Sequence, residues 1–495
     1  MALPHPRLGL SYPAVRVSLP ARLALVVAAV CGAAGLAFLV YGTQARPYGV
    51  VEAELLFQAT RLRRGFPLYV DPFVGAWELG PPPSRYYVLY TPVWPWLLAH
   101  AGASTAVGMR GVGRVVNSLL YLATLAIVVR TSRPAERLLV GTAALLVLGF
   151  AMLTREAGLA TADMPAVALA VAGLARTLRK GGLDSASAAL LMAAPLVKPS
   201  VLGIPAGAVL AHLFVQRKPG VRAMLLPLVS GGVVAGGLVA VFHVASGGAW
   251  LTHIVRATGQ TLSFERWVRE LGSRAMFLGA PHAAALAAAV RRRATPRATV
   301  PLAVSLGWSI FSMAKHGSGT HYWLEPTMAA LLALGAMDPL PAAPAPRALS
   351  WVGLTFTAAA AGVTLAELAR APAAFRSWND RIAELRARCP LGPGEVLVAS
   401  DASLEMEIDG RVIVPSWQSS YLVRSGTFPL EAWRRDLAMP EVRCFVDGPQ
   451  FLEPRPERIE GITEVNAFRR ELRDVIEDNF QREGEVDGLL LYRRR

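Results

Sequence analysis

The sequence predicts a polytopic α-helical membrane protein of about 11 spans with a small C-terminal extracytoplasmic α/β domain. Of its 495 residues, 53% are hydrophobic and only 17% are charged, which is too apolar for a soluble enzyme of this length. Leu, Ala and Val form runs long enough to cross a hydrocarbon core of about 30 Å. The alternation over roughly ten residues that marks a transmembrane β-barrel is missing, so we expect helical spans.

The first apolar run follows several arginines and could be read as a signal sequence. It is too long for the apolar region of a signal peptide and has no A-x-A exit, so we expect an uncleaved anchor. The predicted spans lie near residues 22–42, 109–129, 135–153, 162–178, 184–197, 200–216, 222–244, 274–290, 298–314, 322–337 and 348–369.

Basic loops predict the orientation of these spans. The segment 87–103 is apolar but is broken by Pro92 and Pro95. If it is a short helix on the outer face, every strongly basic turn falls on the cytoplasmic side, as the positive-inside rule requires. We therefore expect a multi-pass protein of the bacterial inner membrane, with a cytoplasmic N-terminus and a periplasmic C-terminal domain.

The chain changes character near residue 376. Residues 1–375 carry a net charge of +19, spread over separate loops, and residues 376–495 carry −4. No nucleic-acid partner is expected, because nucleic acid requires one continuous basic face. The C-terminal domain has no Gly-rich phosphate loop. Its expected elements are strands at 395–400, 411–415, 442–448 and 488–493 and a helix around 465–480.

The three cysteines give little reason to expect a metal centre. Cys389 and Cys444 lie in the C-terminal domain, where a disulfide would suit an extracytoplasmic location and two unpaired core cysteines would be equally compatible. Cys31 lies in the first apolar run. No CxxC motif or Cys/His cluster is present, so a structural zinc site is not expected.

Carboxylates are rare enough before residue 376 to be candidates individually. Only thirteen occur, and most of them lie at the predicted outer surface. An amphipathic helix is expected from Glu54 to Gly65, which suits a helix C-terminus. Glu52 and Glu54 are separated by about 200° of helical rotation, so one is expected to face a site and the other to be solvated.

An ordered set of short motifs resembles the GT-C glycosyltransferases, a superfamily that includes protein O-mannosyltransferases and lipid A aminoarabinose transferases. The resemblance covers essentially the whole chain, and each motif alone is weak. The motifs are Glu52, Gly65-Phe-Pro-Leu-Tyr69, Tyr90-Thr-Pro92-Val-Trp-Pro95, Arg114, Asp163-Met164-Pro165, Lys198 and the segment from Lys315 to Glu325.

The resemblance implies inverting transfer of a sugar from a polyprenyl-phosphate donor to a glycan, lipid or protein acceptor. Glu52 would be the base that takes the acceptor proton. The family usually has Asp at this position, and the change to Glu leaves Glu54 as an alternative in the alignment. Glu52 could instead be a surface carboxylate paired with Arg46 or Arg61. Asp163 would orient the acceptor or bind a divalent metal, although Asp followed by Pro also suits a helix start. No cofactor is certain.

Several further residues are expected to contact the donor phosphate or the sugar. Lys198 and Lys315 lie at outer helix ends, where the positive-inside rule disfavours them and where they could bind phosphate or contact outer-leaflet lipid. Arg114 is expected to pair with Glu52 or Asp163 as a structural clamp. Glu325 enters a span, with Lys315 or His321 as its expected partner. The other candidates are Tyr69, Tyr90, Arg155, His316, His321 and Tyr322.

Two other functions remain open at this stage. A transporter or flippase of a lipid-linked precursor would need charges deep within its spans, and these spans are nearly free of charge. A glycan polymerase or ligase that uses a diphosphate donor would share the multi-span architecture and the outer active site. The residues alone hardly separate it from the transferase.

Overall fold

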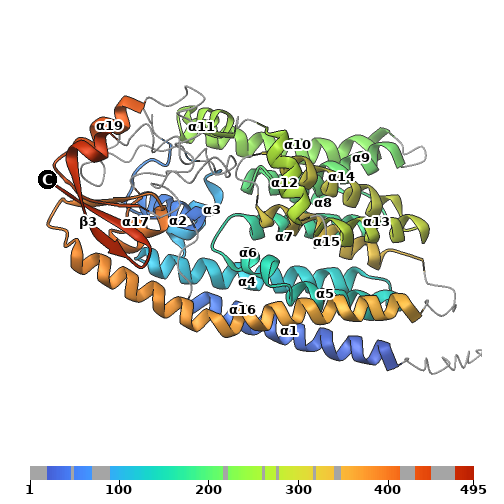
Figure 1. The fold of residues 1–495 in the computed structure, drawn as a ribbon. Helices are drawn as coiled ribbons and strands as arrows, with labels where there is room; N and C mark the ends of the chain where they lie inside the picture. The colour runs from blue at the N-terminus through green and yellow to red at the C-terminus, as the bar shows by residue number, and fades with distance from the viewer. Residues whose placement is uncertain are drawn as a thin grey trace, which may run out of the picture.

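The protein is a long helical bundle with a C-terminal domain at one end (Figure 1). In this computed structural model the C-terminal helix of the bundle runs along its whole length, beside the first helix, and continues into that domain. The described residues are 19–45, 50–69, 88, 90–215, 221–258, 262–274, 278–315, 319–338, 347–412, 430–447 and 474–495.

The predicted spans overlap helices, except that 135–153 covers the break between α5 and α6 and 274–290 includes residues outside the described ranges. Among the described residues, three helices (α1, α4 and α10) are long and apolar enough to cross a membrane alone, or four if the bent pair Pro134–Leu148 and Ala151–Gly158 forms one span. The number of spans near eleven stays a prediction. The bundle helices are α1 (Leu19–Ala45), α4 (Ala106–Thr131), α5 (Arg137–Leu148), α6 (Ala151–Gly158), α7 (Asp163–Lys180), α8 (Ser185–Val197), α9 (Gly203–Val215), α10 (Val221–Ala245), α13 (Ala280–Arg291), α14 (Pro296–Ser312), α15 (Leu324–Gly335) and α16 (Arg347–Arg388).

The remaining helices connect these spans. The segment 87–103 contains one eight-residue helix, α3, which is about 12 Å long and cannot cross a core of about 30 Å. The described part of the loop 245–273 contains the helix α11 and most of α12. These connecting helices are α2 (Val50–Arg63), α3 (Val93–His100), α11 (Ala249–Thr258), α12 (Phe264–Arg274) and the 3-10 segments η1 (Pro134–Glu136) and η3 (Thr320–Trp323).

A break between α5 and α6 redirects the chain. The two helices are bent by 75° at Gly149 and Phe150. A Cβ on Gly149 would lie 2.4 Å from the Cβ of Cys31, so only glycine lets α1 pack against the break. The hydroxyl of Thr154 donates to the Leu148 carbonyl, which the helix no longer satisfies, at 2.6 Å. The bend brings the loop after α6 beside the start of α2.

The C-terminal domain is a four-stranded mixed sheet flanked by helices. Strand order is β1-β2-β4-β3, with β1 and β2 parallel and the other pairs antiparallel. Asp487 and Gly488 join β3 to β4, and both have positive φ, as a tight two-residue hairpin turn requires. The elements are β1 (Val396–Ala399), α17 (Ala402–Ile408), α19 (Leu430–Ala438), β2 (Val442–Asp447), β3 (Phe480–Val486) and β4 (Leu489–Arg494).

Two details of the sequence prediction differ in this domain. The strand β3 begins at Phe480, where a helix was expected to end, and no strand was predicted there. Arg411 and Val412 do not form a strand, and the rest of the predicted strand 411–415 lies outside the described residues.

The end of α16 is part of the C-terminal domain. The helix continues without interruption across residue 376 to Arg388, and Ile382 and Leu385 pack in the core of the domain. A disulfide joins Cys389, directly after α16, to Cys444 in β2. Closing a loop of 55 residues stabilises the folded state by about 4 kcal/mol. A disulfide also suits an oxidising compartment.

Candidate active site

Helix α2 lies inside the protein rather than on a membrane surface. It begins at Val50 and ends at Arg63, and Gly65 follows with φ of 83°, which favours glycine. Its apolar residues Leu55, Leu56 and Phe57 are all fully buried. The C-terminal domain packs on this helix through α17 (Figure 1), and on the predicted polar face Arg61 is buried while Arg63 is exposed.

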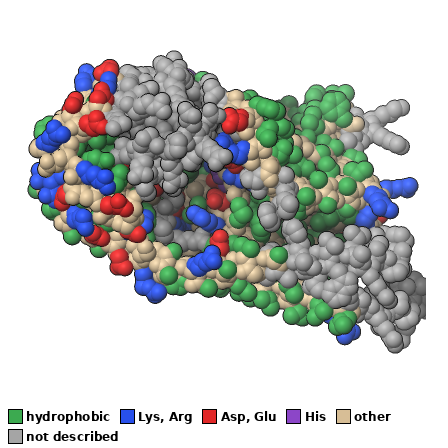
Figure 2. All heavy atoms as spheres, in the orientation of Figure 1, with side chains coloured by type: hydrophobic (Ala, Val, Ile, Leu, Met, Phe, Trp, Pro, Cys, Tyr) green, Lys and Arg blue, Asp and Glu red, His purple; other side chains and the backbone are tan. Residues whose placement is uncertain are grey.

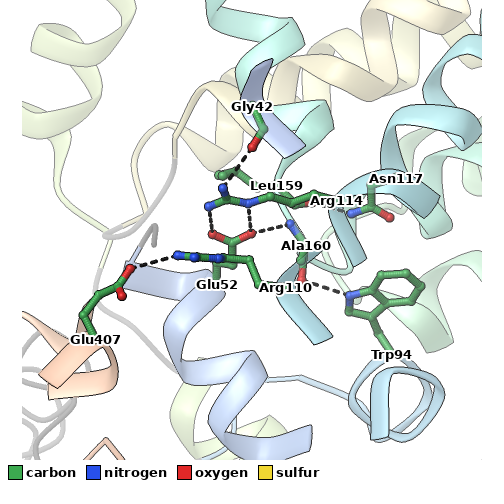
Figure 3. Close-up of polar contacts among 9 residues, drawn as sticks. All are labelled: Gly42, Glu52, Trp94, Arg110, Arg114, Asn117, Leu159, Ala160 and Glu407. Carbon is green, nitrogen blue, oxygen red and sulfur yellow. Dashed lines mark hydrogen bonds and ion pairs between the residues drawn. The ribbon is translucent and has the colours of Figure 1, made fainter. Parts of the chain in front are cut away.

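Glu52 is the centre of a buried clamp (Figure 3). Arg114 of α4 donates to both carboxylate oxygens, from Nε to Oε1 at 2.8 Å and from Nη2 to Oε2 at 2.5 Å. The backbone N–H of Ala160 also donates to Oε1, at 2.8 Å, and Arg114 Nη1 reaches the Gly42 carbonyl. Both charged side chains are almost fully buried. The expected pairing of Arg114 with Glu52 therefore occurs, and it ties α1, α2, α4 and the α6–α7 loop together.

The α6–α7 loop is held by two further side chains in the same view (Figure 3). Asn117, three residues after Arg114, donates from Nδ2 to the carbonyls of Leu159 and Thr161. Trp94 of α3 donates from Nε1 to the Ala160 carbonyl at 3.1 Å. The loop that leads to Asp163 is thus fixed by hydrogen bonds from α2, α3 and α4.

Glu54 faces a different environment from Glu52. Its side chain is only 3% exposed, so the expectation that one of the two glutamates is solvated was wrong. Burial, and to a smaller extent the charge of Asp401, raise the pKa of Glu54 to about 8. Asp401 is the N-cap of α17. The C-terminal domain therefore brings a second carboxylate toward the one on α2.

Asp163 and Lys198 form a second buried ion pair. Lys198 Nζ lies 3.1 Å from Asp163 Oδ2, and 4.5 Å from the ring centroid of Tyr90. Burial raises the pKa of Tyr90 well above its ordinary value, and the charges of Asp163 and then Glu54 act in the same direction. Tyr90 is therefore close enough to interact with both the glutamate on α2 and the ion pair of Asp163 and Lys198.

Positive charge accumulates around this ion pair. Burial lowers the pKa of Lys315, and the nearby Lys198 charge lowers it further. Burial lowers the pKa of His321 to about 4, although the negative charge of Asp163 acts in the opposite direction. The imidazole is therefore neutral at pH 7. Lys198 and Lys315 are thus ammonium groups that could hold an anion here, beside the carboxylates of Asp163 and Glu156. His316 lies outside the described residues.

The surface is hollowed between the C-terminal domain and the helical bundle, where Figure 2 shows basic, acidic and histidine side chains. The C-terminal domain is anchored at this place by an ion pair between Arg110 of α4 and Glu407 of α17, with Nη1 and Oε1 2.8 Å apart (Figure 3). Ala402 and Met406 of α17 also belong to the apolar core of the bundle.

The other candidates divide into supporting and peripheral residues. The Tyr69 hydroxyl donates to the Tyr90 carbonyl at 2.7 Å, and this hydrogen bond helps to fix the backbone at Tyr90. Burial raises the pKa of Tyr69, so its proton stays in place. Tyr322 is close enough to interact with Asp163 and hydrogen bonds Ser200. Arg155 is exposed on α6.

Glu325 has a structural environment. Its Oε1 accepts the N–H of Ile204 at 2.5 Å, and Gly203 also donates to it. These are the first two residues of α9, whose N–H groups have no partner within the helix. The carboxylate therefore caps a helix N-terminus from α15. These partners differ from the expected Lys315 or His321. The start of α9 provides N–H donors without partners in the helix, and it is too far from Glu325 in the sequence to be identified as the partner.

A metal does not fit the described side chains. No group of three His, Cys, Asp or Glu residues comes together as potential ligands within the described ranges. Asp163, the residue for which a metal was considered, has one carboxylate oxygen on Lys198. We derive no step of the chemistry through a metal.

Sequence reasoning missed several of these residues. Asp401 follows a predicted strand and precedes Ser403, a pattern typical of an N-cap, which signals a turn but not its distant neighbour. Asn117 is three residues from Arg114, so both lie on one helix face, and a buried amide there could have indicated the clamp. Nothing local marks Trp94 as the partner of Ala160.

The described fold is a helical bundle with a buried carboxylate after its first helix and a C-terminal α/β domain, and solved structures share this fold. Two solved structures of ArnT from Cupriavidus metallidurans are similar to this chain. The one bound to undecaprenyl phosphate has a TM-score of 0.55 and 14% identity, over 96% of this chain and 97% of that one. The apo structure has the same TM-score at 16% identity.

A third structure with the same fold is the archaeal oligosaccharyltransferase AglB from Archaeoglobus fulgidus, in complex with an inhibitory peptide and a dolichol-phosphate. Its TM-score is 0.51 at 12% identity, over 95% of this chain and 74% of that one. No family model matches the sequence, and a search of curated proteins found no match. At these identities the likeness shows the fold alone.

Proposed function

We propose that this protein is an inverting glycosyltransferase that moves a sugar from a polyprenyl-phosphate donor to an acceptor hydroxyl at the outer face of the bacterial inner membrane. The observation that carries the proposal is one site in which a buried, weakly acidic glutamate and a cluster of cations meet around Tyr90. Glu54 has a pKa of about 8, which suits a group that must take up a proton near neutral pH.

The reaction requires few groups. The acceptor oxygen attacks C1 of the sugar and the bond between C1 and the phosphate oxygen breaks, through an oxocarbenium-like state. Glu54 takes the proton of the acceptor hydroxyl, and the polyprenyl phosphate leaves with the electron pair. Lys198 and Lys315 stabilise the negative charge that develops on the leaving phosphate.

Glu52 serves as a positioning residue in this scheme. Three hydrogen bonds from Arg114 and Ala160 occupy its two carboxylate oxygens. Because its oxygens are held in this way and its side chain is fully buried, we assign the reaction to Glu54 rather than to Glu52. We assign to Glu52 the task of fixing the first turn of α2, on which Glu54 stands.

The choice of donor rests on chemistry and on the fold. Two lysines beside one aspartate suit a single phosphate group, and the donor must reach the site from the membrane, which suits a lipid carrier. Two proteins with the same fold were solved with undecaprenyl phosphate and with a dolichol-phosphate, which supports this class of donor. The sugar and the acceptor are left open.

The test is a transfer assay with purified protein. Radiolabelled polyprenyl-phosphate and polyprenyl-diphosphate monosaccharides are supplied in detergent, with water as the default acceptor, and release of the polyprenyl carrier is measured. We expect release from a monophosphate donor, loss of at least 100-fold in Glu54→Gln, and wild-type release in Glu265→Gln, an exposed glutamate of α12.

Three results would contradict the proposal. Activity with the diphosphate donor alone would favour a polymerase or ligase. Movement of intact donor across liposomes without cleavage would favour a flippase. Full activity in Glu54→Gln would remove the base.

A further inference from the structure

A groove between α1, α4 and α5 lies at the opposite end of the bundle from the candidate active site. It has a volume of about 530 Å³, and its lining is apolar apart from Arg130, Arg137 and Thr142. Thr142 turns its hydroxyl onto the Leu138 carbonyl of its own helix. The groove therefore presents hydrocarbon along its length and two guanidinium groups as its only charges.

The two arginines differ from their neighbours in their partners. Arg133 is paired with Asp338 at 2.6 Å, and Arg292 is paired with Glu136 at 2.8 Å. These pairs occupy the nearby carboxylates. Within the described ranges, no carboxylate pairs with the guanidinium of Arg130 or Arg137, and both side chains are exposed.

The groove is open to the outside of the bundle. Leu138 is 62% exposed and Leu145 is 37% exposed, both on the face of α5 that lines it. At Gly141 a Cβ would meet no atom within 4 Å, so space remains at the middle of the groove. An exposed apolar depression that ends in unpaired cations fits a molecule with a hydrocarbon chain and an anionic headgroup.

We propose that this groove is a binding site for an anionic phospholipid, with an acyl chain along α5 and the phosphate between Arg130 and Arg137. The charge complementarity selects the anionic headgroup, and the apolar lining selects the chain. The site is separate from the proposed transferase chemistry and does not depend on it. It would fasten the broken helix pair α5–α6, and so the loop that supports Glu52, to the lipid around it.

The experiment compares lipids and variants by native mass spectrometry of purified full-length protein. We expect phosphatidylglycerol to remain bound to the wild-type protein and phosphatidylcholine of the same chain length to be retained at least tenfold less. Arg130→Gln with Arg137→Gln should weaken phosphatidylglycerol binding by about tenfold or more, because each surface arginine contributes about 1 kcal/mol to anionic lipid binding. Arg179→Gln with Lys180→Gln, which removes two exposed charges at the same end of the bundle, should change it little.

A second variant tests the acyl chain. Gly141→Leu places a side chain in the groove without a backbone clash and with better helix propensity, so the protein should fold. It should lose bound phosphatidylglycerol although both arginines remain. Equal retention of phosphatidylcholine, unchanged binding in the double arginine variant, unchanged binding in Gly141→Leu, or displacement of phosphatidylglycerol by an equimolar polyprenyl phosphate would each overturn the assignment.

Discussion

The substitution Asp401→Asn removes one negative charge of the C-terminal domain and is expected to leave the structure of the domain unchanged. Asp401 caps α17 by accepting the Ser403 N–H at 2.8 Å and the Ser403 hydroxyl at 2.6 Å. Asparagine is an equally good N-cap and keeps an acceptor oxygen in the same place, so the fold should be preserved. Only the negative charge near Glu54 disappears.

The size of the effect follows from the electrostatics of Glu54. Its pKa is about 8 because burial disfavours the charged form and because Asp401 repels it. A unit charge several ångströms away contributes about 2 kcal/mol at an effective dielectric of about 20, which corresponds to about 1.5 pH units. Tyr90 also interacts with Glu54, and the arginines of α4 at positions 110 and 114 are engaged with Glu407 and Glu52.

The assay is the pH dependence of kcat/KM. A base must be ionised, so the wild-type rate should rise with pH and level off above about 8. In Asp401→Asn the rise should move down by about 1.5 units, so that the rate at pH 6.5 increases by about tenfold. Glu431→Gln, at an exposed position of α19, should leave the profile unchanged. A profile that stays in place in Asp401→Asn would refute the electrostatic role of Asp401.

The remaining predictions concern stability. Glu54→Gln should raise Tm relative to wild type at pH 9 but not at pH 4. Because the pKa of Glu54 is raised in the folded state, the free energy of unfolding of the wild-type protein falls by roughly 4 kcal/mol as pH rises toward 8. Equal Tm differences at both pH values would contradict this. Arg114→Ala should cost about 3–5 kcal/mol, because it leaves Glu52 buried without its cation, and a double-mutant cycle with Glu52→Gln should show strong coupling in urea unfolding. Cys389→Ser with Cys444→Ser should lower Tm to the value of wild type in reducing agent; a reductant effect that persists in the variant would rule out this pair as its source.

Much of the fold follows from patterns that are local in sequence. Apolar runs located the bundle helices, and the positive-inside rule favoured a short outer helix over a span in the proline-broken segment where α3 forms. Strand β3 was not predicted, because the segment from Gln481 to Glu485 has no apolar residue on either face of the strand. Hydrophobic alternation cannot mark such a strand; its pairing with β4 provides the backbone partners.

The sequence allowed many residues of the candidate site to be named, but it did not show which role each of them has. The sequence could name Glu52 and Glu54 and place them on different helix faces, but which face meets the reactants depends on α17, some 350 residues away. The same holds for Lys198 and Asp163, which are 35 residues apart and meet only through the packing of α7 against α8. Distant contacts of this kind leave no local pattern.

A structure of the protein with undecaprenyl phosphate bound tests the central claim most directly. The account predicts that the phosphate lies within hydrogen-bond distance of Lys198 and Lys315, with the Glu54 carboxylate facing it across the position of the sugar beside Tyr90. A phosphate bound away from the two lysines, with the groove between α1, α4 and α5 as one such place, would contradict it.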